Sequence, residues 1–129
     1  MSPTEPTQDM PLPLTPAVFH ILLALADGER HGYGIMQTIA TFTEGTMRLG
    51  PGTLYRSLKA MLASGLIVAS DERPDPALDD ERRRYYRLTE AGERAAATEV
   101  QRLTRLVAVA GAKPALRLPS PTAPARGEA

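Results

Sequence analysis

The segment GPGTLYRSLKAMLASGLI, residues 50–67, constrains this chain more than any other part of its sequence. A Gly-Pro pair at its start suits the N-cap and first position of a helix, and Gly65 suits the left-handed residue that ends one. The opposite side of this helix carries small residues together with Arg56 and Lys59, so its axis can approach another surface while the long basic side chains reach past it. Its core-facing stripe is predicted to consist of Leu54, Leu58, Met61 and Leu62.

Two further helices are expected before this segment. The first begins after Thr15, which can cap it, with Pro16 at a position that requires no N–H, and it ends near Gly28. Its residues are apolar nearly all round, so it must be covered on more than one side, in part by a second subunit. The second helix spans about residues 32–43, and a brief strand is expected at residues 47–49.

A β-hairpin and a last helix are expected after residues 50–67. The strands lie at residues 66–70 and 84–88, and the loop between them is long, acidic and contains two prolines. Thr89 then caps the last helix, whose first turn contains Glu90 and Glu93.

The last helix carries a narrow apolar seam of the kind found in coiled coils. Its members recur at alternating intervals of four and three residues: Ala96, Val100, Leu103, Val107 and Ala110. A matching helix from a second copy of the chain would explain so regular a seam. The residues expected at the dimer interface come from this helix and from the apolar first helix: Phe19, Leu22, Val100, Leu103, Leu106 and Val107.

The order helix, helix, short strand, helix, hairpin, helix is that of a winged helix-turn-helix, a mainly α fold with a small β-hairpin and here a C-terminal dimerisation helix. The third helix is then the recognition helix. A disordered N-terminal tail is expected at residues 1–13, the DNA-binding domain at 14–88, the dimerisation helix at 89–111 and a disordered C-terminal tail at 112–129.

Composition excludes several classes of protein. The 129-residue chain has no cysteine, which excludes disulfides, thiolate metal ligands and cysteine-based catalysis. The longest apolar run, residues 17–26, is too short to cross a bilayer and follows no basic leader, so we expect a cytoplasmic protein without a membrane partner. His20 and His31 have no companion ligands, and no catalytic order of serine, histidine and acid occurs. We therefore expect no metal, no cofactor and no enzymatic activity.

Three motifs carry a family resemblance: DGERHGYGI, GPGTLYRSLKAMLASGLI and RRYYRLTEAGE. Over residues of about 14–110, their combination resembles the PadR family of bacterial transcriptional regulators. The resemblance implies a homodimeric winged-helix DNA binder, usually a repressor, whose last helix dimerises. The single short C-terminal helix resembles the smaller subgroup of that family.

Seven residues are expected to contact DNA: Tyr33, Thr53, Tyr55, Arg56, Lys59, Arg83 and Arg84. Arginine can read guanine edges, and arginine and lysine both neutralise phosphates. Thr53 either donates to a phosphate or caps its helix, and Tyr55 and Tyr33 either pack in the protein or direct their hydroxyls at DNA. The arginines before the second strand either touch phosphate or balance the acidic residues that precede them.

The favoured function is that of a sequence-specific transcriptional regulator, a repressor that binds an inverted-repeat operator as a homodimer. Its partners would be double-stranded DNA and a second copy of itself; if a small-molecule effector exists, the first and last helices should line its site. The alternative is a winged-helix module for protein–protein contact without specific DNA binding. The net charge of zero and the acidic wing favour the alternative, whereas the basic face of the third helix favours DNA.

Overall fold

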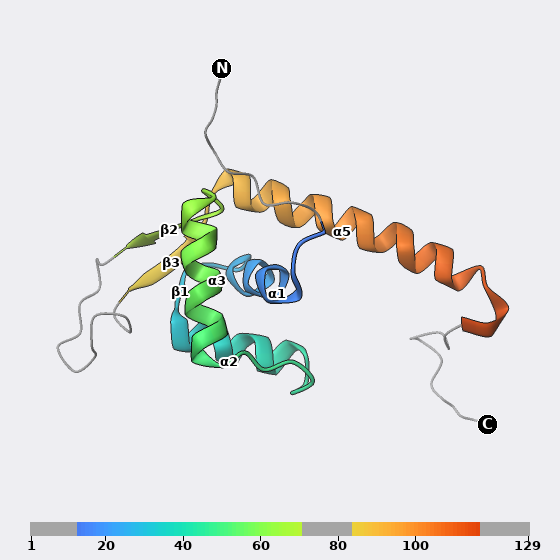
Figure 1. The fold of residues 1–129 in the computed structure, drawn as a ribbon, viewed down its shortest axis with the longest axis horizontal. Helices are drawn as coiled ribbons and strands as arrows, with labels where there is room; N and C mark the ends of the chain where they lie inside the picture. The colour runs from blue at the N-terminus through green and yellow to red at the C-terminus, as the bar shows by residue number, and fades with distance from the viewer. Residues whose placement is uncertain (1–12, 71–83, 117–129) are drawn as a thin grey trace, which may run out of the picture. The chain divides into compact units, whose positions relative to one another are not determined.

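The structure is a computed structural model that describes residues 13–70 and 84–116. Its elements follow in this order along the chain (Figure 1): α1 (Pro16–Leu25), β1 (Arg30–His31), α2 (Gly32–Phe42), α3 (Pro51–Ala63), β2 (Ile67–Ser70), β3 (Tyr85–Leu88), α5 (Glu90–Gly111) and the short 3-10 helix η2 (Pro114–Leu116). The predictions for residues 1–12, 71–83 and 117–129, which concern the two tails and the acidic wing loop, lie outside the described residues.

The chain divides into two compact units, the first reaching Glu99 and the second beginning at Val100. The first ten residues of α5 therefore belong with the winged unit, although the prediction assigned the whole helix to dimerisation. Residues 112–129 were expected to form a disordered tail, yet a 3-10 turn occupies 114–116 of them. Among the described helices, none is long and apolar enough to span a membrane.

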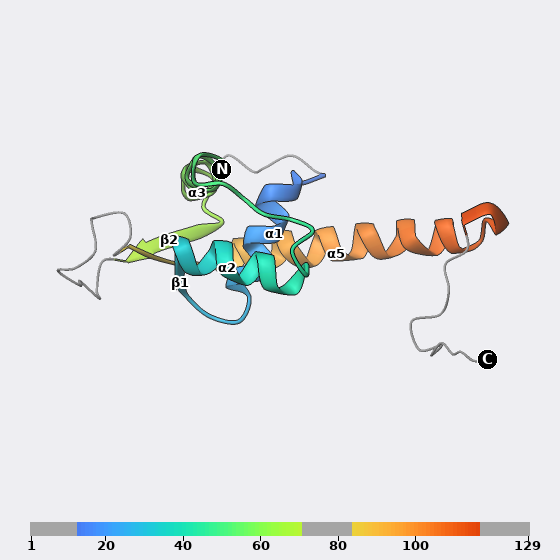
Figure 2. The same ribbon diagram turned by 90° about the horizontal axis from the view of Figure 1, so that it is seen from below.

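The first unit is a winged helix-turn-helix, as the sequence predicts. Helix α1 packs against α2 and α3, and α3 crosses α2 steeply, as the two perpendicular views show (Figures 1 and 2). The wing is a three-stranded antiparallel sheet in the order β1-β3-β2. Within it, β2 pairs with β3 in a register that places Ile67 opposite Leu88 and Ser70 opposite Tyr85.

The short strand lies earlier in the chain than predicted. Residues 47–49 form no strand, because the N–H of Met47 donates to Thr43 Oγ1 (3.2 Å) within the turn between α2 and α3. The additional strand is β1, in which Arg30 pairs with Tyr86 of β3. Two residues are too few for an alternating pattern to show in a sequence, so the position of this strand could not be predicted from periodicity.

Helix α1 begins, and helix α3 begins and ends, at the predicted capping residues, whereas α2 is capped by His31, which was not predicted. Thr15 Oγ1 accepts the N–H of Val18 (3.2 Å), and Pro16 is the first residue of α1. Gly50 is the N-cap of α3, and Gly65 follows the end of that helix with a φ of 78°, in the left-handed region that favours glycine. These boundaries fix which side of each helix faces inward.

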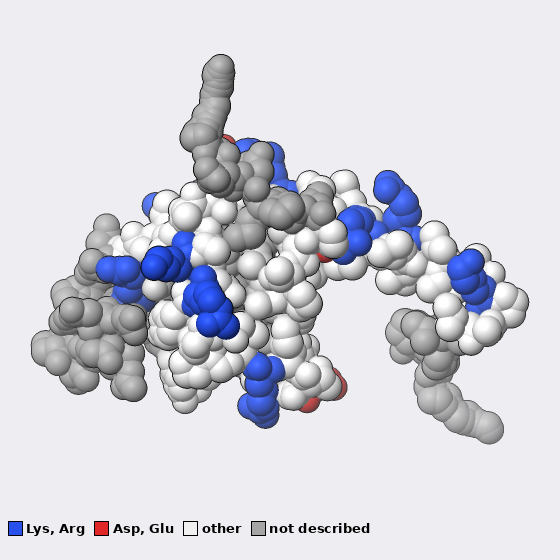
Figure 3. Space-filling view, in the orientation of Figure 1, with Lys and Arg blue, Asp and Glu red and all other residues white. Residues whose placement is uncertain are grey.

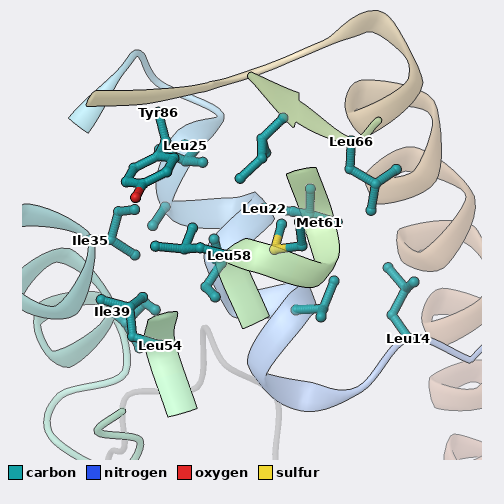
Figure 4. Packing of buried hydrophobic residues seen from close by; sticks show 14 residues of the cluster. Leu14, Leu22, Leu25, Ile35, Ile39, Leu54, Leu58, Met61, Leu66 and Tyr86 are labelled. Atoms are coloured by element: carbon teal, nitrogen blue, oxygen red, sulfur yellow. The ribbon is translucent and has the colours of Figure 1, made fainter. Parts of the chain in front are cut away.

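The hydrophobic core lies between α1, α2, α3 and the sheet, and the start of α5 packs against it (Figure 4). The predicted stripe of α3 is confirmed, since Leu54, Leu58 and Met61 are buried and Leu62 packs against them partly buried. The largest fully buried apolar side chains from the other elements are Ile21, Leu22, Ile35, Ile39 and Ile67. Because one side of α3 is committed to this core, its other side faces outward.

Helix α5 begins close against the chain that follows α3. A Cβ at Gly92 would overlap the carbonyl oxygen of Leu66 and lie 3.1 Å from its carbonyl carbon. These are backbone atoms, which cannot turn aside as the end of a flexible side chain can. The first turn of α5 therefore requires glycine at this position.

We expect Gly92→Ala to lower the free energy of unfolding by about 1–3 kcal/mol, because the added methyl group must displace backbone. Gly52→Ala is the matched control, since Gly52 is also helical and a Cβ there would meet nothing within 4 Å. That control should stabilise the protein by about 0.5–1 kcal/mol through helix propensity alone. Urea denaturation measures both changes; equal effects of the two substitutions would contradict the close contact.

Candidate functional site

The outward side of α3 is a basic surface on a helix that contains no acidic residue. Arg56 and Lys59 lie one turn apart on this side, and both are exposed. Figure 3 shows Lys and Arg side chains over α3 and no Asp or Glu side chain among them. The neighbouring positions on this side are occupied by small exposed residues, Gly52, Ala60 and Ala63. A groove with a negatively charged rim could therefore approach the helix closely.

The N-terminus of α3 adds backbone donors to this surface. Its N-cap is Gly50, which has no side chain to accept the first N–H groups of the helix. Thr53 is consequently not the cap, which removes one of the two roles considered for it. Its hydroxyl oxygen instead accepts a hydrogen bond from Arg56 Nη2 (3.4 Å), while its hydroxyl hydrogen can donate elsewhere. This end of the helix suits an anion.

Tyr55 lies against the first residue of α2. A Cβ at Gly32 would lie 2.9 Å from Tyr55 Cζ and would also overlap the hydroxyl oxygen. Gly32 is buried and Tyr55 is half-buried, so the tyrosine ring packs over a position where only glycine leaves room. The contact brings the N-terminus of α2 alongside α3.

The first turn of α2 presents Tyr33, whose side chain is 57% exposed. This turn is held by His31, the N-cap of α2, whose Nδ1 accepts the N–H of Gly34 (2.9 Å). The ring of His31 also meets Tyr85 of β3 edge-on, with 5.5 Å between the ring centroids. Tyr33 thus lies beside the recognition helix, in a turn that the contacts of His31 hold in place, as a DNA contact would require.

The wing contributes less to the described surface than the sequence suggests. Arg84 is exposed immediately before β3, whereas Arg83 lies outside the described residues. Arg87 is exposed as well, on the side of β3 opposite the buried Tyr86. An exposed arginine that the sequence analysis missed is Arg48, in the turn just before α3. Its charge is visible in the sequence, but a strand at 47–49 would not place it beside the recognition helix.

The residues expected at a dimer interface occupy different environments. Leu22 has no exposed surface, so it belongs to the core of the protomer and its assignment to an interface is withdrawn. Phe19 is partly buried and packs against that core. Leu103 is half-buried, and the remaining three are exposed on α5: Val100, Leu106 and Val107.

The described residues offer no site for metal-dependent chemistry. No group of three or more His, Cys, Asp or Glu side chains in residues 13–70 and 84–116 could hold an ion. His20 and His31, the two histidines of the chain, have separate structural contacts: His20 stacks on Phe42, and His31 caps α2. The two histidines therefore serve the packing and capping of helices in the first unit.

Comparison with known proteins points in the same direction. The sequence model of the family described as "Transcriptional regulator PadR-like family" matches residues 21–98. The transcriptional regulator Rv3488 of Mycobacterium tuberculosis is 43% identical over 83 residues, which make up 64% of this chain and 70% of that protein.

Solved structures share the fold. A PadR family transcription regulator from Clostridium difficile superposes with a TM-score of 0.61 at 24% sequence identity, covering 74% of this chain and 95% of that one. A transcriptional regulator from Clostridium thermocellum has the same TM-score and identity, covering 72% of this chain and 84% of that one. At this level of identity, these two likenesses concern the fold alone.

We expect Gly32→Ala to cost about 1–3 kcal/mol of unfolding free energy, because the methyl group competes with the Tyr55 ring. The cost should largely vanish in a Tyr55→Ala background, where the ring is absent. A double-mutant cycle by urea denaturation should give a coupling free energy of about 0.5–3 kcal/mol. Additive single effects would show that the two residues do not compete for space.

Proposed function

Because the chain belongs to the PadR-like family of transcriptional regulators, we propose that it is a homodimeric repressor that binds an inverted-repeat operator. Family membership makes it a DNA-binding regulator rather than an enzyme. The repressor role, the dimer and the form of the operator are the parts that we infer. They are supported by the recognition surface of α3 and by the exposed apolar side of α5.

The observation that carries the proposal is the acid-free outward side of α3. Arg56 and Lys59 stand on it among small residues, next to a helix N-terminus without a side-chain cap. Small residues allow the helix to enter a major groove, where the arginine can reach base edges and the lysine a phosphate. A dimer would place two such helices in successive major grooves, about one helical turn or roughly 34 Å apart.

We expect Arg56→Ala to cost about 1–3 kcal/mol on the cognate site and to relax the preference at one base position in each half-site. Lys59→Ala should weaken all duplexes more evenly and flatten the dependence of affinity on salt, because a phosphate contact is lost. The measurement is a set of binding titrations at several salt concentrations. The duplexes are one recovered by selection from a random-sequence library and a scrambled version of it.

Arg94→Ala is the control, since Arg94 is exposed and its loss removes the same charge from a different helix, α5. It should leave sequence preference unchanged. If Arg56→Ala and Lys59→Ala both bind the selected duplex as the wild type does, α3 does not read DNA. The chain would then use its winged unit for protein–protein contact.

The proposed dimer is supported by the part of α5 that belongs to the second unit. Its apolar side chains spread over about half of the helix circumference, which is wider than the narrow seam expected from the sequence. Val107 is 64% exposed, and the other exposed members are Val100, Leu106 and Val109. An isolated helix surface of this kind is costly to leave in water, and a second copy of α5 would cover it.

We expect the wild type to sediment as a dimer at micromolar concentration and Val107→Glu to raise the dimer dissociation constant at least about 100-fold, because a charge would be buried. Ala108→Glu is the matched control, because Ala108 is exposed on the other side of the same helix. Sedimentation equilibrium measures both. A monomeric wild type, or equal effects of the two substitutions, would exclude this interface.

A planar small-molecule effector would find aromatic surface on α1 and α2. Helix α1 presents partly buried Phe19 beside His20, and the His20 ring stacks on exposed Phe42 of α2 at a centroid distance of 6.1 Å. Such rings offer flat apolar surface to a planar effector. An effector bound to α1 would act on the helix that packs directly against α3.

A further inference from the structure

The chain turns sharply between the end of α3 and the start of β2. Gly65 adopts a φ of 78°, and its N–H donates to the carbonyl of Leu62 (3.2 Å). The N–H of Leu66 donates to the carbonyl of Met61 (3.0 Å). These bonds close the last turn of α3 and leave the carbonyl oxygens of Gly65 and Leu66 to be satisfied by another part of the chain.

Thr89, the residue just before α5, satisfies both carbonyls. Its backbone N–H donates to the Leu66 carbonyl (3.0 Å), and its Oγ1 donates to the Gly65 carbonyl (2.6 Å). The same Oγ1 accepts the N–H of Gly92 (3.0 Å) and so caps α5. A hydroxyl group has one hydrogen and two lone pairs, so a single side chain can make both bonds at once. Thr89 thus holds the end of α3 and the beginning of α5 together.

Steric contact reinforces this connection between the end of α3 and the start of α5, which we call the α3–α5 joint. The missing side chain at Gly92 lets the first turn of α5 lie directly against the Leu66 carbonyl, where no Cβ would fit. The two helices are therefore fixed to each other by backbone atoms on both sides, with the Thr89 hydroxyl between them. Backbone contacts leave less freedom of orientation than contacts through long side chains.

We propose that Thr89 is a positioning residue that sets the direction of the recognition helix relative to the first turn of α5, and thereby the spacing of operator half-sites that the dimer accepts. The inference depends on the proposed function, because it requires a dimer that reads two half-sites. The apolar residues proposed for the dimer interface belong to the same helix that Thr89 caps. A looser joint would let each α3 change its direction without any change in the residues that touch DNA.

Substitutions at Thr89 can separate the joint from helix capping. Thr89→Ser keeps the hydroxyl and both of its bonds, whereas Thr89→Val removes both at similar size. Thr89→Asp still caps α5, because a carboxylate accepts N–H groups at a helix N-terminus, but it cannot donate to the Gly65 carbonyl. The Asp variant therefore keeps the proposal testable even if the Val variant folds poorly.

Thr15 provides the matched control elsewhere in the molecule. It caps α1 through the same kind of bond, from the N–H of Val18 to Oγ1 (3.2 Å). Among the described residues, that hydroxyl bonds to no other helix or strand. Thr15→Val should therefore cost similar stability through loss of a cap but leave the α3–α5 joint intact.

The experiment uses the full chain and duplexes that contain two copies of the half-site recovered from a random-sequence library. The separation of the copies is varied in steps of one base pair, and affinity is measured for each variant. We expect the wild type, Thr89→Ser and Thr15→Val to prefer one spacing by about tenfold, and Thr89→Val and Thr89→Asp to reduce this preference to about threefold or less. Base preference within each half-site should stay the same in all variants.

Two results would overturn the inference while leaving the proposed function intact. One is a spacing profile of Thr89→Asp and Thr89→Val equal to that of the wild type. The other is an equal loosening by Thr15→Val, which would trace the effect to general stability. Recovery of no paired half-sites by the wild type would instead refute the dimeric operator, and the role of Thr89 with it.

Discussion

The position of the recognition helix depends on two places where a side chain is absent. At Gly32 the ring of Tyr55 occupies the space that a Cβ would fill, and at Gly92 the Leu66 carbonyl does so. The first contact holds α3 against the start of α2, and the second holds its end against the start of α5. With the core stripe of α3 committed inward, these contacts leave only one side of the helix facing outward, and that is the side with Arg56 and Lys59.

The fold could be predicted from the sequence wherever a residue type has a local physical role. Thr15, Gly50 and Gly65 end or begin helices through caps and backbone freedom that depend on a few neighbouring residues. The strand β1 could not, because it is only two residues long and exists through its pairing with β3. The sequence pattern was also unable to show that Leu22 is enclosed by its own protomer, since an apolar residue looks the same in a core and at an interface.

The charged residues of the candidate site could be predicted from the sequence, but most of the contacts that hold them in place could not. Arg56 and Lys59 follow from helical periodicity, because their side of α3 is opposite the apolar stripe. The sequence alone does not explain why position 32 is a glycine. The explanation is the ring of Tyr55, 23 positions later in the chain, which occupies the space that a Cβ at position 32 would need. The second role of Thr89 was equally hidden: a helix cap can be read locally, but its bond to the Gly65 carbonyl joins residues 24 positions apart.

The net charge of zero, which weighed against DNA binding, says nothing of how the charges are distributed over the surface. At physiological salt, the potential that a phosphate meets is set by charges within about 8 Å, since more distant ones are screened. Helix α3 contains no acidic residue, and Figure 3 shows no acidic side chain over it. A chain with equal numbers of acids and bases can therefore present a locally positive surface, provided that the acids lie beyond the screening length. Its weak overall charge would also limit non-specific attraction to DNA, so that more of the affinity must come from the residues that read the groove.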